Sequence, residues 1–140
     1  MPYADNGGVR IHYQVEGEGR PALVLQHGFT ESVVDWYESG YVETLRSDYR
    51  LILIDARGHG ASDKPHDPDA YLLNRRVSDV VAVLDASDIA KALFWGYSIG
   101  GGSALGLPNM PQKEFTLWRL ESNIHMPAAC GLSSRWFKGG

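Results

Sequence analysis

Cysteine is nearly absent from this 140-residue sequence, in which Cys130 is the only one. No disulfide can form within the chain, which favours a reducing compartment such as the cytoplasm. No apolar run approaches the ~20 residues that a helix needs to cross a bilayer. Residues 1–8 also lack the basic and apolar pattern of a signal peptide. We therefore expect a cytoplasmic protein with no membrane partner.

The chain also lacks an excess of positive charge, since its formal net charge is −4. A charge of this sign does not favour nucleic acid as a partner. No residue spacing is typical of a metal site, and the run Gly100-Gly101-Gly102 lacks the lysine of a phosphate-binding loop. We expect neither a metal nor another cofactor. The sequence leaves the oligomeric state open.

What the sequence does contain begins with a strand pattern near the N-terminus. Apolar and polar residues alternate over residues 9–16, which predicts a strand with one solvent-exposed face. The turn residues Asn6-Gly7-Gly8 precede it, so we expect an antiparallel hairpin with Tyr3-Ala4. In this alternation His12 falls among the polar residues that are expected to face solvent.

Strands and helices then alternate along the chain. Three short, uninterrupted apolar runs are typical of strands covered on both faces of a parallel sheet. These runs are residues 22–25, 51–54 and 92–95. Between them, Ser32 is placed to cap a helix that extends to Leu45, and residues 73–84 carry a helical apolar stripe. The pattern predicts an α/β fold with mostly parallel strands, flanking helices and the N-terminal antiparallel hairpin.

The motif Gly96-Tyr97-Ser98-Ile99-Gly100 follows the last of these apolar runs. After a strand and before a helix, G-x-S-x-G is typical of a sharp turn that holds the serine clear of the sheet. Gly96 and Gly100 let the neighbouring backbone approach closely, and a helix N-terminus favours developing negative charge. We predict Ser98 as a nucleophile. The alternative is an ordinary glycine and serine loop.

The tripeptide His27-Gly28-Phe29 follows the apolar run 22–25 after one intervening residue, Gln26. A loop in this place can offer a second backbone N–H, from Phe29, to pair with that of Ile99. Two such donors stabilise a tetrahedral oxyanion, and losing one costs ~3–4 kcal/mol. The alternative is an ordinary strand-to-loop turn. For the His27 side chain we prefer a structural hydrogen bond to nearby backbone.

The segment DARGHGAS, residues 55–62, follows the second apolar run. A carboxylate and a guanidinium two residues apart can lock a loop, and its glycines permit tight turns. The residues concerned are Asp55, Arg57, Gly58 and Gly60. His59 is a candidate catalytic base, but a structural loop histidine is the preferred interpretation.

In order and spacing, these three motifs resemble those of the α/β-hydrolase fold family, in its branch with a serine nucleophile. The resemblance covers residues 3–102 and implies a hydrolase domain with Ser98 as nucleophile and the N–H groups of Phe29 and Ile99 as oxyanion hole. Epoxide hydrolases and haloalkane dehalogenases carry aspartate in place of this serine, which argues against those chemistries. Esterases, lactonases, carbon–carbon bond hydrolases and cofactor-free haloperoxidase-like enzymes remain, so a small ester-like substrate is expected.

The resemblance also implies what is missing. In this family the catalytic acid and then the histidine follow the serine along the chain. Only 42 residues follow Ser98, and His125, their only histidine, does not come after a recognisable strand. A serine hydroxyl without a base is a poor nucleophile. We therefore expect a truncated hydrolase sheet, a serine hydrolase fragment that is nearly inactive alone.

Residues 103–140 depart from the family pattern. Prolines interrupt any long helix, the periodicity ends, and the charge balance turns from acidic to basic. We predict residues 1–102 as the N-terminal half of a hydrolase domain, and the rest as an atypical tail, partly helical or disordered. The strand at 92–95 would then lie at an open sheet edge.

A change of reading frame would account for this departure. Synonymous codons for residues 104–138, read one base earlier, can encode a helix-like and then a strand-like segment. We therefore hypothesise a one-base frameshift near Ser103. The alternative is a genuine short protein with its own C-terminal segment.

Two classes of function fit these observations. The first is acyl hydrolysis by a full-length parent of this fragment. The second is a non-catalytic module that uses the same scaffold to hold a small ligand. A gene remnant without function is the third interpretation.

Overall fold

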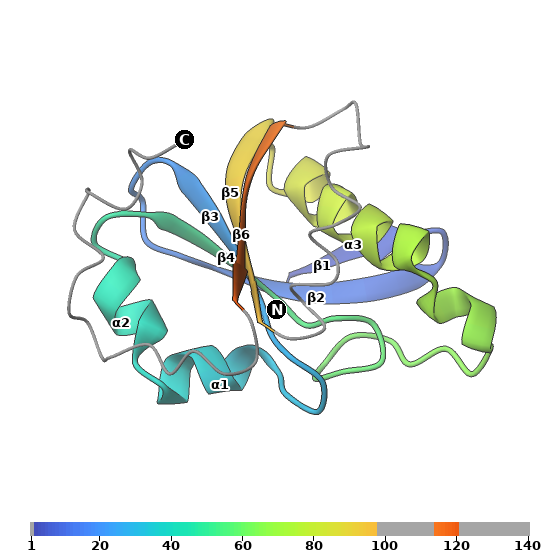
Figure 1. Ribbon diagram of the computed structural model, residues 1–140. Helices are drawn as coiled ribbons and strands as arrows, with labels where there is room; N and C mark the ends of the chain where they lie inside the picture. Colours follow the sequence, from blue (N-terminus) through green and yellow to red (C-terminus); the bar gives the residue numbers. More distant parts are fainter. Residues whose placement is uncertain (1, 98–113, 121–140) are drawn as a thin grey trace.

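The computed structural model describes residues 2–97 and the backbone of residues 114–120. Its strands form one six-stranded sheet in the order β1-β2-β4-β3-β5-β6 (Figure 1). The strands are β1 (Tyr3–Asn6), β2 (Val9–Glu16), β3 (Ala22–Gln26), β4 (Arg50–Ile54), β5 (Lys91–Tyr97) and β6 (Glu114–Leu120). The helical elements are α1 (Val33–Glu38), α2 (Tyr41–Leu45), the 3-10 helix η1 (Pro68–Tyr71) and α3 (Leu73–Ala86).

The sheet is antiparallel only near the N-terminus. β1 pairs with β2 through a turn in which Gly7 and Gly8 have φ values of 64° and 88°, and β2 pairs antiparallel with β4. The remaining pairs, β4 with β3, β3 with β5 and β5 with β6, are all parallel. The predicted α/β fold with an N-terminal hairpin and a mostly parallel sheet is confirmed.

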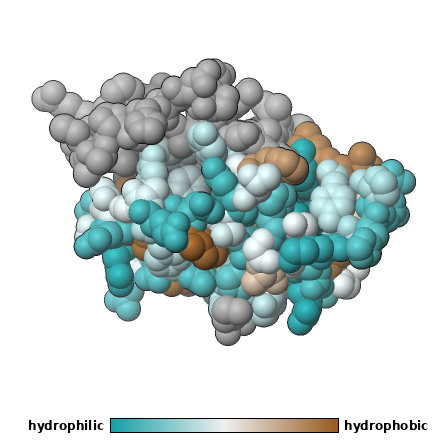
Figure 2. Space-filling model, turned by 90° about the horizontal axis from the view of Figure 1, so that it is seen from below, coloured by the Kyte–Doolittle hydropathy of each residue, from teal (hydrophilic) through white to brown (hydrophobic). Residues whose placement is uncertain are grey.

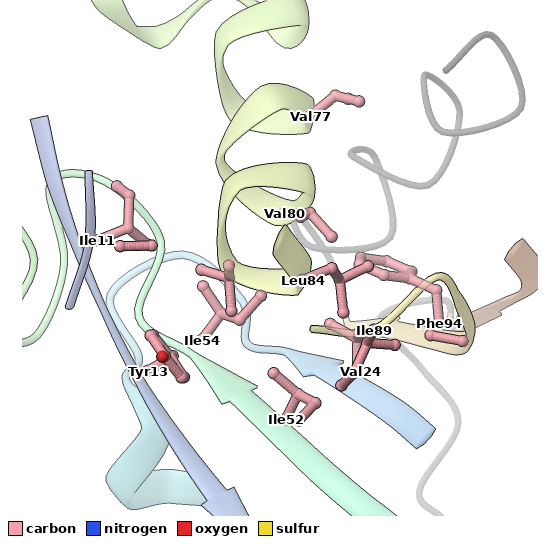
Figure 3. Close-up of a cluster of buried hydrophobic side chains, with 13 residues drawn as sticks. Ile11, Tyr13, Val24, Ile52, Ile54, Val77, Val80, Leu84, Ile89 and Phe94 are labelled. Atoms are coloured by element: carbon pink, nitrogen blue, oxygen red, sulfur yellow. The ribbon is translucent and has the colours of Figure 1, made fainter. Parts of the chain in front are cut away.

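The apolar strand residues divide between the two faces of the sheet. Ile52 and Ile54 belong to a buried cluster with α3, whereas Leu51 and Leu53 belong to one with α1 and α2. Figure 3 shows the first cluster, in which side chains of the sheet gather against α3. All four residues are fully buried, and burying a side chain of this size contributes ~1.5–3 kcal/mol. Helices on both faces therefore explain why the runs show no alternation.

The helix predicted from Ser32 to Leu45 is two helices. Ser32 caps α1 as expected, in a capping box with Asp35. The chain then breaks at Gly40, whose φ of 84° is left-handed, before α2 begins. The second predicted helix matches α3, whose buried stripe includes Val77, Val80 and Leu84. No helix among the described residues has the length and apolar character to cross a membrane.

β6 corrects one expectation about the tail. β5 was expected at an open edge, but residues 91–97 pair in parallel register with residues 114–120. The tail segment EFTLWRL contains two aromatic residues and a threonine, residue types that favour strands. The prolines before it exclude a long helix but not a strand, so the expectation of an open edge at β5 is wrong. The predicted boundary at residue 102 lies outside the described residues.

Candidate functional site

The carboxyl ends of β3, β4 and β5 meet at one edge of the sheet, because these three strands are parallel neighbours. Gln26, the last residue of β3, lies opposite Ile54 of β4 and Gly96 of β5. The chain leaves β3 through α1 and α2, and leaves β4 through α3, which covers the opposite face (Figure 1). Such a switch point is where open α/β sheets bind ligands. Figure 2 views this end of the molecule, where hydrophobic patches lie within a largely hydrophilic surface.

His27 begins the loop after β3 and is 1% exposed. Its Nδ1 lies 2.8 Å from the Gly28 carbonyl oxygen, and its Nε2 accepts the Ala56 N–H at 3.0 Å. Nδ1 therefore carries the ring proton. Burial is the main cause that lowers the pKa of His27 below 6.5. A neutral imidazole with both nitrogens engaged joins this loop to the loop after β4.

Gly28 brings the loop against the residue before Ser98. A Cβ on Gly28 would lie 2.9 Å from the Tyr97 ring, so this close approach needs glycine. The Gly28 N–H donates to the Glu31 carboxylate at 2.8 Å, which turns the loop back toward α1. Ser98 itself, with Ile99 and Gly100, lies outside the described residues, and their predicted roles stay predictions.

Phe29 and Thr30 form the exposed part of this loop. Phe29 is 66% exposed, and its ring packs edge-on against His59 at 5.7 Å between centroids. Thr30 has a φ of 67°, which a β-branched residue rarely adopts. Within the described part of the chain, the Phe29 N–H donates to no other group.

Asp55 is the centre of the loop after β4. Its buried carboxylate accepts hydrogen bonds from the Val33 N–H at 2.9 Å and the Ala61 N–H at 3.1 Å, and His12 Nδ1 lies 2.7 Å away. Gly60, with a φ of 49°, passes so close that a Cβ would lie 2.3 Å from this carboxylate. Asp55 thus joins β2, β4 and the N-terminus of α1.

His12 is a site residue that the strand pattern missed. Its place among the polar residues of β2 predicted exposure, but it is 2% exposed. Its ring is covered by the Asp55 carboxylate, 2.7 Å from Nδ1, and by the Tyr3 ring, at 5.5 Å between centroids. The segment after Gly60 runs beside the β2 backbone, where the His12 N–H donates to Ser62 Oγ at 2.8 Å. No periodic signal within β2 could predict this cover. The sequence pattern also does not predict that His12 pairs with the Asp55 carboxylate.

Arg57 does not pair with Asp55, although their spacing suggested a shared role in locking the loop. Its guanidinium makes a two-pronged contact with Asp79 of α3, at 2.7 and 2.6 Å, and donates to the Ala70 carbonyl at 2.6 Å. Asp79 also accepts from the Asn6 side chain at 2.7 Å. The hydrogen bond that Arg57 donates to Asp79 is the main cause that raises the pKa of Arg57. Arg57 therefore fixes α3 to the loop.

His59 lies between the two loops. Its ring centroid is 5.2 Å from that of His27, and its Nδ1 is 3.1 Å from the Arg57 carbonyl oxygen. Gly58 has a φ of 82° and packs against the Tyr71 ring, which closes this part of the loop. His59 therefore contacts both His27 and Phe29 of the loop after β3.

A pocket of about 590 Å³ opens between the two loops and the start of α3. Phe29, Thr30, His59, Tyr71 and Arg76 contribute to its lining. The pocket therefore combines aromatic and cationic groups beside the Phe29 N–H. The described residues contain no cluster of three side chains suited to hold a metal ion.

Comparison with known proteins gives matches over most of this region. The family model of the alpha/beta hydrolase fold matches residues 21–108. Mouse epoxide hydrolase 4 is 34% identical over 97 residues, which cover 69% of this chain and 26% of that protein. The non-heme chloroperoxidase of Streptomyces lividans is 39% identical over 100 residues, covering 68% of this chain and 34% of the relative.

Solved structures of other proteins have a similar fold over most of this chain. Est816, described as an N-acyl homoserine lactone degrading enzyme, superimposes with a TM-score of 0.75 at 38% identity, covering 85% of this chain and 44% of its own. The enol-lactonase from Burkholderia xenovorans LB400 has a TM-score of 0.69 at 33% identity, with 76% and 40% covered. The chain spans at most about a third of the length of these curated relatives, and less of others.

Proposed function

The chain belongs to the α/β-hydrolase fold family, and on this premise we propose that it carries the nucleophile and the oxyanion hole of a serine hydrolase. The observation that carries the proposal is the Phe29 N–H, which has no partner among the described residues and lies in the loop beside Tyr97. Ser98 comes directly after Tyr97, at the end of β5. The motif Gly96–Gly100 favours a turn that would bring the serine hydroxyl to this loop.

The chemistry follows from these groups. Ser98 Oγ attacks the carbonyl carbon of an ester, and the carbonyl electron pair moves to its oxygen. The N–H groups of Phe29 and Ile99 hold this oxyanion, and each donor is worth ~3–4 kcal/mol in the transition state. A histidine takes the serine proton and passes it to the leaving alkoxide. Water then cleaves the acyl–enzyme, which restores the serine.

We propose that the histidine and its acid lie outside the described residues. His12 pairs with Asp55, both ring nitrogens of His27 are engaged, and His59 Nδ1 contacts the Arg57 carbonyl. We infer that this chain alone hydrolyses its substrate very slowly, since loss of a triad partner costs several orders of magnitude. The full activity then requires the residues that the family places after the nucleophile.

The substrate class is a small ester or lactone. Two structures with the same fold are described as lactone-degrading enzymes, and the pocket beside Phe29 is of a size suited to small molecules. The epoxide hydrolase relatives point to another chemistry, but a serine at position 98 does not suit the ester intermediate formed on an aspartate. A soluble cytoplasmic location is proposed with it. A non-catalytic ligand-binding module is the competing function.

A fluorophosphonate probe tests the proposal. We expect no labelling of the 140-residue chain above its Ser98→Ala variant, and strong labelling at Ser98 when residues 1–102 are joined to the C-terminal part of a lactonase relative. Labelling of the isolated chain at Ser98 would contradict the dependence on a later histidine. A joined protein that folds, binds lactone and is not labelled would favour the binding module.

The proposed frameshift needs a different measurement. The family match ends at residue 108, soon after Ser103, which supports a change in the underlying sequence there. Reading the coding DNA around codon 103 tests the hypothesis. Relatives that carry the same tail in frame would show it to be wrong.

A further inference from the structure

The loop that carries Phe29 is anchored at both ends on two consecutive residues. At its start, His27 Nε2 accepts the Ala56 N–H at 3.0 Å. At its end, the Val33 N–H donates to Asp55 Oδ1 at 2.9 Å. Only five residues lie between these anchors, so the end of β4 sets where the Phe29 N–H points. The hydrogen bond at Val33 depends on the orientation of the Asp55 carboxylate.

His12 holds the Asp55 carboxylate in this orientation through the oxygen that Val33 does not use. Its Nδ1 lies 2.7 Å from Asp55 Oδ2, the oxygen not used by Val33, and both side chains are almost fully buried. Within residues 2–97 no group hydrogen-bonds to His12 Nε2, so a proton there would have no acceptor. The ring therefore carries its proton on Nδ1 and donates it to the carboxylate. Two backbone bonds also hold His12 to this corner: its N–H donates to Ser62 Oγ and its carbonyl accepts the Asp55 N–H.

We propose that His12 is a positioning residue of the oxyanion hole, acting through Asp55 on the loop that carries Phe29. This inference rests on the proposed function, because it presumes that the Phe29 N–H binds the oxyanion. His12 touches neither substrate nor nucleophile in this account. It holds one oxygen of Asp55 so that the other oxygen faces the Val33 N–H.

Amide hydrogen exchange and amide chemical shifts of the 140-residue chain test this directly. His12→Leu removes the donor at similar volume, and we expect the Val33 N–H to exchange about tenfold faster, the value of one lost hydrogen bond. The Phe29 amide resonance should shift with it. His12→Asn keeps a donor at the same distance from the backbone, since its Nδ2 takes the place of Nδ1, and should restore both readouts.

His66→Leu is the matched control, because His66 is an exposed histidine on the surface. A role limited to core stability would speed exchange at all protected amides together, and asparagine would not rescue it selectively. A folded His12→Leu protein with unchanged Val33 and Phe29 amides would overturn the proposal. So would an asparagine variant that behaves like leucine.

A measurement on the unaltered chain covers the case in which His12→Leu does not fold. The imidazole ¹⁵N spectrum should show His12 with its proton on Nδ1, in slow exchange with water. A proton on Nε2 instead would overturn the proposal. These readouts report backbone and ring geometry, so they stand or fall separately from the labelling of Ser98.

Discussion

The loops after β3 and after β4 lie side by side at the same edge of the sheet, yet they are built in opposite ways. In the loop after β4, Asp55 and Arg57 are buried, and each makes several hydrogen bonds. In the loop after β3, Phe29 is exposed, Thr30 is left-handed and one N–H is unused among the described residues. We call residues 55–62 the supporting loop, because their buried side chains are hydrogen-bonded. We call residues 27–32 the working loop, because they carry the exposed Phe29.

The difference has a physical basis. A buried charge is tolerated only when its hydrogen bonds are complete, so the loop after β4 has little freedom to move or to bind anything else. A loop that binds a ligand must keep a donor unsatisfied until the ligand arrives. That donor is held in place by neighbours that are themselves fully bonded. We therefore expect damage to the supporting loop to have the larger effect.

The largest effect is expected at the pair between Arg57 and Asp79. Asp79→Leu leaves the Arg57 guanidinium buried without its carboxylate, which should lower the free energy of unfolding by about 3–5 kcal/mol. The double variant Arg57→Met with Asp79→Leu should recover most of this loss, because it removes the buried guanidinium together with its partner. Urea unfolding measures both. An Asp48→Leu change at an exposed site is the control, with an effect below ~0.5 kcal/mol.

Gly60→Ala should destabilise the supporting loop by about 1–3 kcal/mol. The new Cβ would lie 2.3 Å from the Asp55 carboxylate, in a backbone with a φ of 49°. Gly40→Ala separates the two causes, because Gly40 is also left-handed but has nothing within 4 Å of its Cβ position. If both variants lose the same stability in thermal unfolding, the close approach to Asp55 contributes nothing and the comparison of the loops is weakened.

How far the sequence predicted this arrangement depends on how local each feature is. The strand runs, the Ser32 cap and the α3 stripe each follow from neighbouring residues, and the structure confirms them. The burial of His12 depends on residues distant in the chain, since Asp55, which covers its ring from 2.7 Å, is 43 residues away. Periodicity within one strand carries no information about such cover.

Two other failures have equally specific causes. The break between α1 and α2 depends on Gly40, which has a left-handed conformation. The spacing of apolar residues is the same with or without this break, so the pattern does not predict it. The tail shows neither the period of two nor that of 3.6 residues, so periodicity does not predict β6, a strand of seven residues. Of the predicted site, Asp55 and His59 contact the loop after β3, while Arg57 pairs with Asp79 of α3 rather than with Asp55.

Acid should weaken the connection between the two loops. Burial lowers the pKa of His27 below its unfolded value of 6.5, despite opposing effects of the Gly28 carbonyl, Asp55 and Glu31. Below pH 6.5 the unfolded chain binds a proton at this histidine, whereas His27 of the folded chain stays neutral. The free energy of unfolding therefore falls as pH falls, by at most ~1.4 kcal/mol per pH unit. His27→Gln should reduce this slope between pH 6.5 and 5, whereas His66→Gln at an exposed site should not. A slope that His27→Gln leaves unchanged would assign it to another group.

The smallest effect is expected in the working loop itself, at Thr30. A β-branched residue with a φ of 67° is strained, and asparagine adopts this conformation more readily. Thr30→Asn should therefore raise the free energy of unfolding by ~0.5–1 kcal/mol, while the same change at Thr44, in the right-handed helix α2, should lower it slightly. Stabilisation at Thr30 would mean that the strain is imposed by the anchors at His27 and Val33 rather than by the threonine. Destabilisation would mean that the threonine side chain holds the loop, and the division into a supporting and a working loop would then fail.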